Sequence, residues 1–279
     1  MMRMLILIAV GCVAMQYDGL IPAKADGAQT ATRPANRPWG LPEGLPPWVY
    51  EHPGSVSTQP VELDNPSARK THEGYLQLVS DVKAGKAKID LLFIGDSITA
   101  CWNGEKKLFD QHYGRFGAAA FGVAGDQSQN VLWRLAHGEI EGLSPKVVVL
   151  LIGTNQMHDQ FTVQDVIDGQ AAILKVLREK LPNTKVLLLG VFPNKNVSLL
   201  EKIRKTNAGL AKLADGKNVR FLDFGDKLLD AQGQVTKENF VDGVHLTNKG
   251  YQIWAREMNP LLTEMLGVAA SEPAGKDAP

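Results

Sequence analysis

Cysteine is scarce in this chain, which contains only Cys12 and Cys101 among its 279 residues. Residues 1–25 have the pattern of a removable export signal, so the mature chain is expected to keep Cys101 alone. If the signal is removed after residue 25, the single remaining cysteine cannot form an internal disulfide, and no disulfide-stapled scaffold is then expected for the mature chain.

Neither sign of charge predominates, because 30 Lys and Arg residues balance 30 Asp and Glu residues. The sequence has no basic stripe typical of a nucleic-acid-binding domain and no polybasic run typical of attraction to anionic lipid. It has no Gly-rich loop ending in Lys-Ser or Lys-Thr, which would bind nucleotide phosphates. No cluster of Cys, His and Asp residues has the spacing of a metal site. We therefore expect no cofactor, no metal and no nucleic-acid partner.

The apolar run at residues 4–15 is too short to cross a membrane, which takes about 20 apolar residues. It follows Arg3, and residues 23–25 have the small-x-small form of a cleavage site. Residues 1–25 are therefore predicted to be a signal peptide, and the protein is predicted to be periplasmic or secreted. The alternative is a lipoprotein signal that ends at Cys12.

Three segments follow the predicted signal. Residues 26–66 are rich in proline and are predicted to form an extended arm. The arm contains three large aromatic residues that favour packing on the domain, although a sugar-binding surface also fits them: Trp39, Trp48 and Tyr50. Residues 67–268 are predicted to be the catalytic domain, and residues 269–279 a disordered tail.

Strands and helices alternate within the predicted domain. Strands are expected at 89–94, 118–123, 146–152, 185–191 and 219–223. Helices are expected at 67–84, 127–138, 163–180, 198–214 and 247–266. The run KVVVLLI from residue 146 is typical of a parallel strand buried on both faces. The alternation predicts an α/β fold with a parallel sheet and helices on both faces.

Chemically capable residues follow three of these strands. Ser97 lies in Gly-Asp-Ser after the first strand, Gly125 follows the second, and Asn155 lies in Gly-Thr-Asn after the third. Asp242 and His245 lie in the final loop before the last helix. The carboxyl ends of parallel strands share one edge of a sheet, so these residues are expected to converge there.

Together these residue types predict acyl transfer. Ser97 would be the nucleophile, His245 the base that accepts its proton, and Asp242 the carboxylate that orients the imidazole. The oxyanion donors would be the backbone N–H groups of Ser97 and Gly125 and the side-chain amide of Asn155. Taken singly, each motif has a simpler interpretation, such as a helix cap at Gly-Asp-Ser or a metal pair at Asp242 and His245.

The four blocks together resemble the SGNH, or GDSL-type, hydrolase family, named for Ser, Gly, Asn and His. The matching blocks are GDSIT, FGVAGD, GTN and DGVHLT, which contain Ser97, Gly125, Asn155 and His245. The run from Phe121 to Asp126, followed by NVLWRL and Gly-Glu, is similar to the subgroup that includes the catalytic subunits of intracellular platelet-activating-factor acetylhydrolase. The resemblance implies a flavodoxin-like three-layer α/β/α sandwich with a five-stranded parallel sheet. It also implies a metal-independent serine esterase with the assignments above.

The expected activity is hydrolysis of carboxylic esters, with short acyl esters of carbohydrate as the favoured substrate. That substrate rests on analogy and on the predicted export. The alternatives are a lipid or lysophospholipid esterase and a carbohydrate-binding protein on a retained hydrolase fold. The sequence leaves open whether the chain is a monomer or a homodimer. It also leaves open whether His158, Trp102 and Phe192 line the pocket or belong to the surface and the core.

Overall fold

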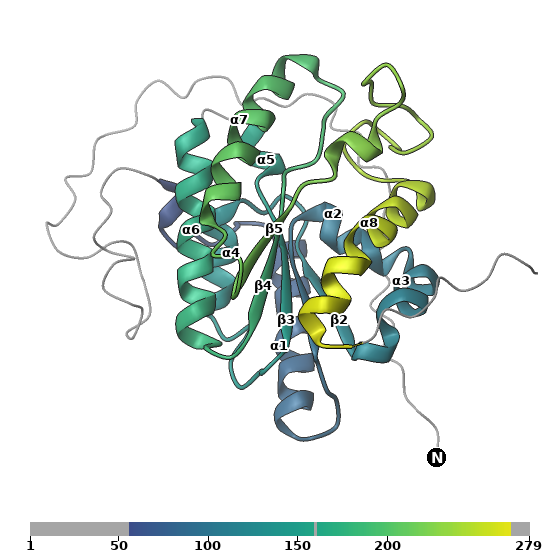
Figure 1. The fold of residues 1–279 in the computed structure, drawn as a ribbon. Coiled ribbons are helices and arrows are strands. Elements are labelled where there is room, and N and C mark those ends of the chain that lie inside the picture. The colour runs from purple at the N-terminus through teal and green to yellow at the C-terminus, as the bar shows by residue number, and fades with distance from the viewer. Residues whose placement is uncertain (1–55, 159–160, 269–279) are drawn as a thin grey trace, which may run out of the picture.

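Five parallel strands form one sheet in the order β2-β1-β3-β4-β5 in this computed structural model, which describes residues 56–158 and 161–268. The strands are β1 (Leu91–Gly95), β2 (Ala118–Gly122), β3 (Val147–Leu151), β4 (Lys185–Leu189) and β5 (Val219–Leu222). Every neighbouring pair is parallel. The chain adds β2 on one side of β1 and the remaining strands on the other, so the winding direction reverses between β1 and β3 (Figure 1).

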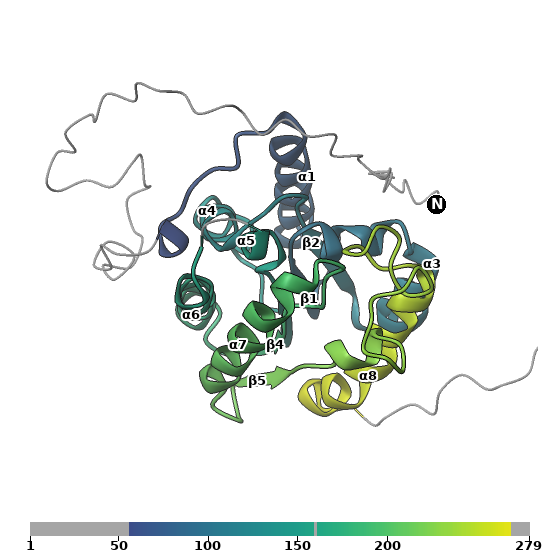
Figure 2. The ribbon, with the colours of Figure 1, turned by 90° about the horizontal axis from the view of Figure 1, so that it is seen from above.

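Helices cover both faces of the sheet (Figure 2). One face carries α1 (Pro66–Lys83), α4 (Ser128–Ala136), α6 (Val163–Lys180) and α7 (Leu200–Leu210). The other carries α2 (Ser97–Ala100), α3 (Lys106–Tyr113) and α8 (Asn248–Leu266), while α5 (Thr154–His158) follows β3 directly. Within the described residues, the short 3-10 helices are η2 (Val56–Thr58), η3 (Cys101–Asn103), η4 (Gly114–Phe116), η5 (Val197–Leu199), η6 (Ala211–Leu213) and η7 (Gly225–Leu228). The predicted α/β/α sandwich is confirmed.

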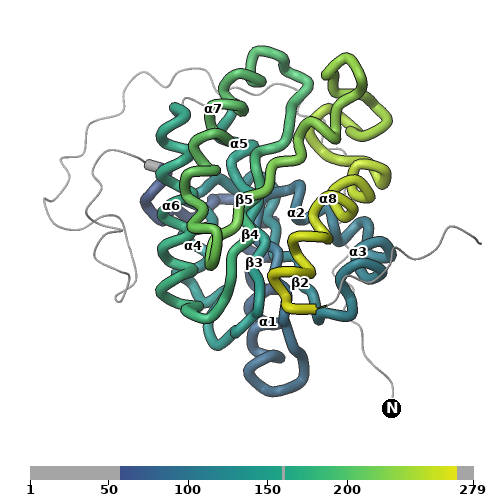
Figure 3. The backbone as a smooth tube through the Cα atoms, in the orientation of Figure 1, coloured from purple at the N-terminus to yellow at the C-terminus, as the bar shows by residue number. Residues whose placement is uncertain are grey.

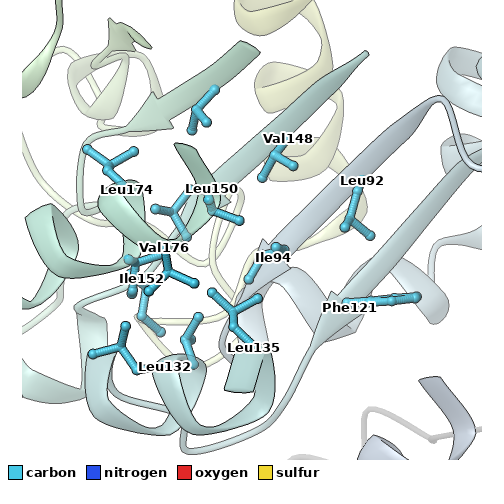
Figure 4. Packing of buried hydrophobic residues seen from close by; sticks show 14 of the residues in the cluster. Leu92, Ile94, Phe121, Leu132, Leu135, Val148, Leu150, Ile152, Leu174 and Val176 are labelled. Atoms are coloured by element: carbon cyan, nitrogen blue, oxygen red, sulfur yellow. The ribbon is translucent and has the colours of Figure 1, made fainter. Parts of the chain in front are cut away.

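Alternation along the strands divides the core into two layers. In β1, Leu92 and Ile94 face the cluster under α4 and α6, whereas Leu91 and Phe93 face the cluster under α3 and α8. Figure 4 shows the first cluster. All five residues of β1 are buried, as expected of a parallel strand covered on both faces.

The segment between β1 and β2 differs from the sequence-based expectation. No helix was expected there, yet residues 97–116 form α2, η3, α3 and η4 in succession. In α3 only Phe109 and Tyr113 are buried, so its apolar pattern is too short to indicate a helix. By contrast, α6 occupies the residues 163–180 that were expected.

Part of the Pro-rich arm is described, from residue 56 onward, and it packs on the domain. Gln156 Nε2 donates to the hydroxyl of Ser57, which is fully buried, at 2.9 Å. The backbone N–H of Val61 donates to the carbonyl of Gln129 at 3.0 Å. The predicted signal, the rest of the arm with its three aromatic residues, and the predicted tail lie outside the described residues. In residues 56–158 and 161–268, no helix combines the length and hydropathy that crossing a membrane requires.

Close backbone packing holds the turn that follows β1. A Cβ atom on Gly122 would lie 2.2 Å from the backbone nitrogen of Ala100, and one on Gly95 would lie 2.2 Å from the carbonyl oxygen of Leu151. Only glycine allows α2 to approach β2 so closely. From α8, the hydroxyl of Tyr251 donates to the carbonyl of Ile98 at 2.6 Å. The first turn of α2 is therefore held from the sheet and from α8 (the chain path is clearest in Figure 3).

Asp96 caps α2 from a fully buried position. Its Oδ1 accepts the backbone N–H of Ile98 at 2.9 Å, while Oδ2 has no hydrogen-bond partner within the described chain. Burial raises the pKa of this carboxyl to about 6, although the hydrogen bond from Ile98 acts in the opposite direction.

This burial predicts a pH-dependent loss of stability. Between pH 3.8 and about 6 the folded carboxyl keeps its proton while the unfolded one releases it, so the folded state binds more protons. The contribution of Asp96 to the free energy of unfolding is therefore fully present below pH 3.8 and falls as the pH rises to about 6. The fall amounts to about 3 kcal/mol, at about 1.4 kcal/mol per pKa unit.

Asp96→Asn removes this titration and keeps a side chain that caps helices well. Urea unfolding of both proteins at several pH values from 4 to 6 should show a steeper fall in stability for the wild type than for the variant. Titrating groups that do not interact with Asp96 are the same in both proteins and cancel in the comparison. Asp126 does not cancel, because the charge of Asp96 raises its pKa, and removing that charge acts in the same direction as the expected effect. Parallel stability curves would contradict the assignment.

Candidate active site

The predicted site residues converge at the carboxyl edge of the sheet. Ser97 is the first residue of α2 after β1, and Asn155 lies in α5 after β3. These two strands are neighbours, and the winding direction reverses between them. Ligands bind to open α/β sheets at such a reversal point.

Ser97, His245 and Asp242 form a continuous hydrogen-bonded relay. The distance from Ser97 Oγ to His245 Nε2 is 2.8 Å, and that from His245 Nδ1 to Asp242 Oδ2 is 2.7 Å. An ionised carboxylate can only accept hydrogen bonds, so Nδ1 carries the ring hydrogen and Nε2 is left to accept the hydroxyl proton of Ser97. This arrangement prepares the serine to lose its proton.

Asp242 is held in its ionised form by its own turn. Its Oδ1 accepts the backbone N–H groups of Val244 and His245 at 2.9 and 2.8 Å. Partial burial alone would raise the pKa of Asp242, but the hydrogen bonds from the backbone and the ring of His245 and from Val244 keep it below its usual value. The carboxylate is therefore a permanent acceptor at neutral pH.

Backbone contacts fix the turn that carries this pair. Phe240 and Leu246 form an antiparallel bridge across the turn. Gly243 has a φ of +92°, and its carbonyl accepts the backbone N–H of Lys195 from the loop after β4 at 3.0 Å. The side chain of Lys195 also fills the space in which a Cβ of Gly243 would lie. The loop after β4 thus supports the turn of the relay.

The three predicted oxyanion donors lie on adjacent loops. Gly125 has a φ of +87°, a conformation that side-chain-bearing residues rarely adopt. A Cβ atom there would meet only Leu63, at 3.6 Å, so this glycine is needed for its backbone angle rather than for a lack of space. Asn155 Nδ2 donates one hydrogen to the backbone carbonyl of Asp126 at 2.7 Å, which fixes the amide next to Gly125.

Two supporting residues were missed in the sequence analysis. Gln156 Oε1 accepts the backbone N–H and the hydroxyl of Ser128 at 3.1 and 2.8 Å, and thereby joins α5 to the start of α4. Arg134 is buried on α4, and its Nε donates to Asp126 Oδ2 at 2.8 Å. Arg134 lies within the NVLWRL run that supports the family resemblance, but that resemblance assigned no role to this residue.

The residues with open assignments are also placed. Trp102 and Phe192 are fully buried in the core beneath α8 and do not line an open pocket. His158 is exposed, and its Nε2 lies 2.8 Å from Nδ2 of Asn194. Over the ranges that the structure describes, no three His, Cys, Asp or Glu side chains are grouped as a metal site requires.

Comparison with known proteins gives consistent matches. The sequence profile of the GDSL-like Lipase/Acylhydrolase family matches residues 93–253. Platelet-activating factor acetylhydrolase IB subunit alpha2 of Homo sapiens is 32% identical over 183 residues, which cover 63% of this chain and 77% of that protein. Subunit alpha1 of Bos taurus is 32% identical over 180 residues, which cover 63% of this chain and 76% of that protein.

Solved structures agree in fold. The crystal structure of a GDSL-like lipase from Bacteroides thetaiotaomicron superposes with a TM-score of 0.58 at 21% identity, covering 69% of this chain and 97% of that one. The family profile spans more than half of the chain, and the relatives are acetylhydrolase subunits. This chain belongs to the GDSL-like lipase/acylhydrolase family and is an ester hydrolase.

Proposed function

We propose that the chain hydrolyses short acyl esters through an acyl-enzyme on Ser97. The relay from Ser97 Oγ through His245 to Asp242, with contacts of 2.8 and 2.7 Å, is the observation that carries the proposal. His245 Nε2 removes the hydroxyl proton as Ser97 Oγ attacks the carbonyl carbon of the ester. Nε2 then returns that proton to the oxygen of the leaving alcohol.

Deacylation repeats the same proton transfers with water. Nε2 takes a proton from a water molecule, whose oxygen attacks the acyl carbon of the Ser97 ester. Collapse of the second tetrahedral intermediate returns the proton to Ser97 Oγ and releases the carboxylic acid. Asp242 stabilises the imidazolium that forms in each half-reaction and keeps its ring in the productive tautomer.

The proposed oxyanion hole stabilises both tetrahedral intermediates. It consists of the backbone N–H groups of Ser97 and Gly125 and the Nδ2 group of Asn155. Asn155 spends one amide hydrogen on the carbonyl of Asp126, and the other remains for the oxyanion. A donor fixed in this way needs no reorganisation during the reaction, and each such donor typically contributes ~10²–10³ in rate.

The proposed substrate is an acetyl or other short acyl ester of carbohydrate, handled outside the cytoplasm. The signal-like pattern of residues 1–25 supports export. The large hydrophobic side chains that are exposed in the described chain are four valines, Val61, Val197, Val241 and Val268, and only Val241 adjoins the relay. A lipid interface usually requires a larger contiguous apolar patch.

N-terminal sequencing of the secreted protein tests the export proposal, which predicts a start at Asp26.

A short acyl ester of a phospholipid is the second candidate. It is favoured by the 32% identity to platelet-activating factor acetylhydrolase subunits. In both candidates the acyl group is short, and the difference lies in the alcohol.

Substitutions in the relay test the mechanism. Ser97→Ala should lower kcat for p-nitrophenyl acetate by at least about 10⁴-fold and leave thermal unfolding unchanged, because the nucleophile is lost. His245→Ala should have a similar effect, whereas Asp242→Asn should keep a larger residual rate because the orienting group is the most replaceable member. A Ser97→Ala protein that retains wild-type turnover would overturn the proposal.

A substrate panel separates the two candidates. We expect kcat/KM to fall steadily along the p-nitrophenyl series from acetate to palmitate, since the proposed acyl group is short. Acetylated xylo-oligosaccharides should then be hydrolysed faster than a 2-acetyl ether phosphocholine. The reverse order would establish the lipid alcohol, and a maximum at palmitate would contradict both candidates. The Ser97→Ala protein is the control for each substrate.

A further inference from the structure

Arg134 is a buried cation directly behind the proposed oxyanion hole. Its side chain is 4% exposed and forms ion pairs with Asp126 and Glu139. Its Nη2 group also lies 3.3 Å from the carbonyl oxygen of Gly95 and 3.4 Å from that of Phe121. One guanidinium group therefore contacts the ends of β1 and β2 and the loop that follows β2.

Three of the four contacts of Arg134 lead toward the proposed oxyanion donors, and the fourth is the ion pair with Glu139. Gly95 precedes Ser97 by two residues at the end of β1. Asp126 directly follows Gly125, and its side chain accepts from Arg134 Nε at 2.8 Å. The backbone carbonyl of the same Asp126 accepts from Asn155 Nδ2 at 2.7 Å, so the third donor is joined to the guanidinium through one residue.

We propose that Arg134 is a positioning residue that sets the spacing of the three oxyanion donors. This inference rests on the proposed function, because it takes the oxyanion hole of Ser97, Gly125 and Asn155 as given. The planar guanidinium has five N–H donors in a fixed fork, which lets it bond several loops at once. A lysine ammonium could pair with a carboxylate but could not span the same set of acceptors.

The surroundings of Arg134 keep it charged and fixed. Burial by itself lowers the pKa of Arg134, but the carboxylates of Glu139 and Asp126 raise it above its usual value. Glu139 is held in turn by Nδ1 of His72 on α1, at 3.2 Å. Burial raises the pKa of Asp126 to about 7, while the charge of Arg134, which donates to Oδ2, acts in the opposite direction.

Buried ion pairs contribute little net stability compared with apolar residues of similar volume. If packing were the only requirement, an apolar side chain at position 134 would therefore meet it. Three of the four contacts of Arg134 instead lie on the loops of the proposed oxyanion hole or on the strand ends that lead into them. The geometry accounts for an arginine there better than stability does.

Arg134→Lys tests the inference, because it keeps the positive charge and removes the forked N–H donors of the guanidinium group. We expect kcat for p-nitrophenyl acetate to fall about 10- to 100-fold with KM nearly unchanged, since oxyanion contacts act in the transition state. The matched control is Arg220→Lys on the outer strand β5, which alters an ion pair with Glu264 of α8 and should leave kcat unchanged. An unchanged kcat in a folded Arg134→Lys protein would overturn the inference.

A double-mutant cycle with Asn155→Ala separates positioning from a general structural effect. If Arg134 acts through the oxyanion hole, Arg134→Lys should cost much less in the Asn155→Ala background than in the wild type. Fully additive losses would overturn the inference. If Asn155→Ala itself left kcat unchanged, the proposed oxyanion hole would fail instead.

Should Arg134→Lys fail to fold, the same cycle is run with Asp126→Asn. This variant keeps the guanidinium buried and weakens only its charge-assisted bond to the loop of Gly125. We expect a loss of kcat of several-fold that is again coupled to Asn155→Ala. Additive losses, or no loss, would overturn the inference in the same way.

Discussion

Parallel strand direction is the constraint on which the site depends. All five strands end at one edge, so the loops after β1, β2 and β3 meet there although they are separated by dozens of residues in the chain. Because β1 and β3 are neighbours at the point where the winding reverses, Ser97 and Asn155 are brought to the same edge of the sheet. The turn that carries Asp242 and His245 therefore has to approach only this one edge of the sheet to contact Ser97.

The residues of the relay and the residues around Arg134 differ in burial. The side chains of His245 and Asp242 are 31% and 40% exposed, so protons, water and substrate can reach the relay. Arg134, Asp126 and Glu139 are almost fully buried behind it, where a low dielectric strengthens their contacts. The proposed proton transfer would therefore take place at an accessible surface, while the residues that hold the proposed oxyanion donors lie in the buried interior.

The sequence predicted the fold and the relay because both leave local patterns. The sequences of β1 and β3 are apolar runs of the length of a strand, and Ser97 and His245 lie within short sequence motifs. The rest depends on contacts between distant residues. The carbonyl of Asp126 that fixes Asn155, the carboxamide of Gln156 that joins α5 to α4, and the fork of Arg134 have no local signature. The short α3 was missed since only two of its residues are buried.

The most direct test of the acyl-enzyme account is the position of a covalent adduct. The protein is treated with a fluorophosphonate, digested and analysed by peptide mass spectrometry. The account predicts one modified residue, Ser97, with loss of esterase activity in proportion to labelling and no label in Ser97→Ala. A different modified residue, or full esterase activity in protein labelled completely at Ser97, would contradict it.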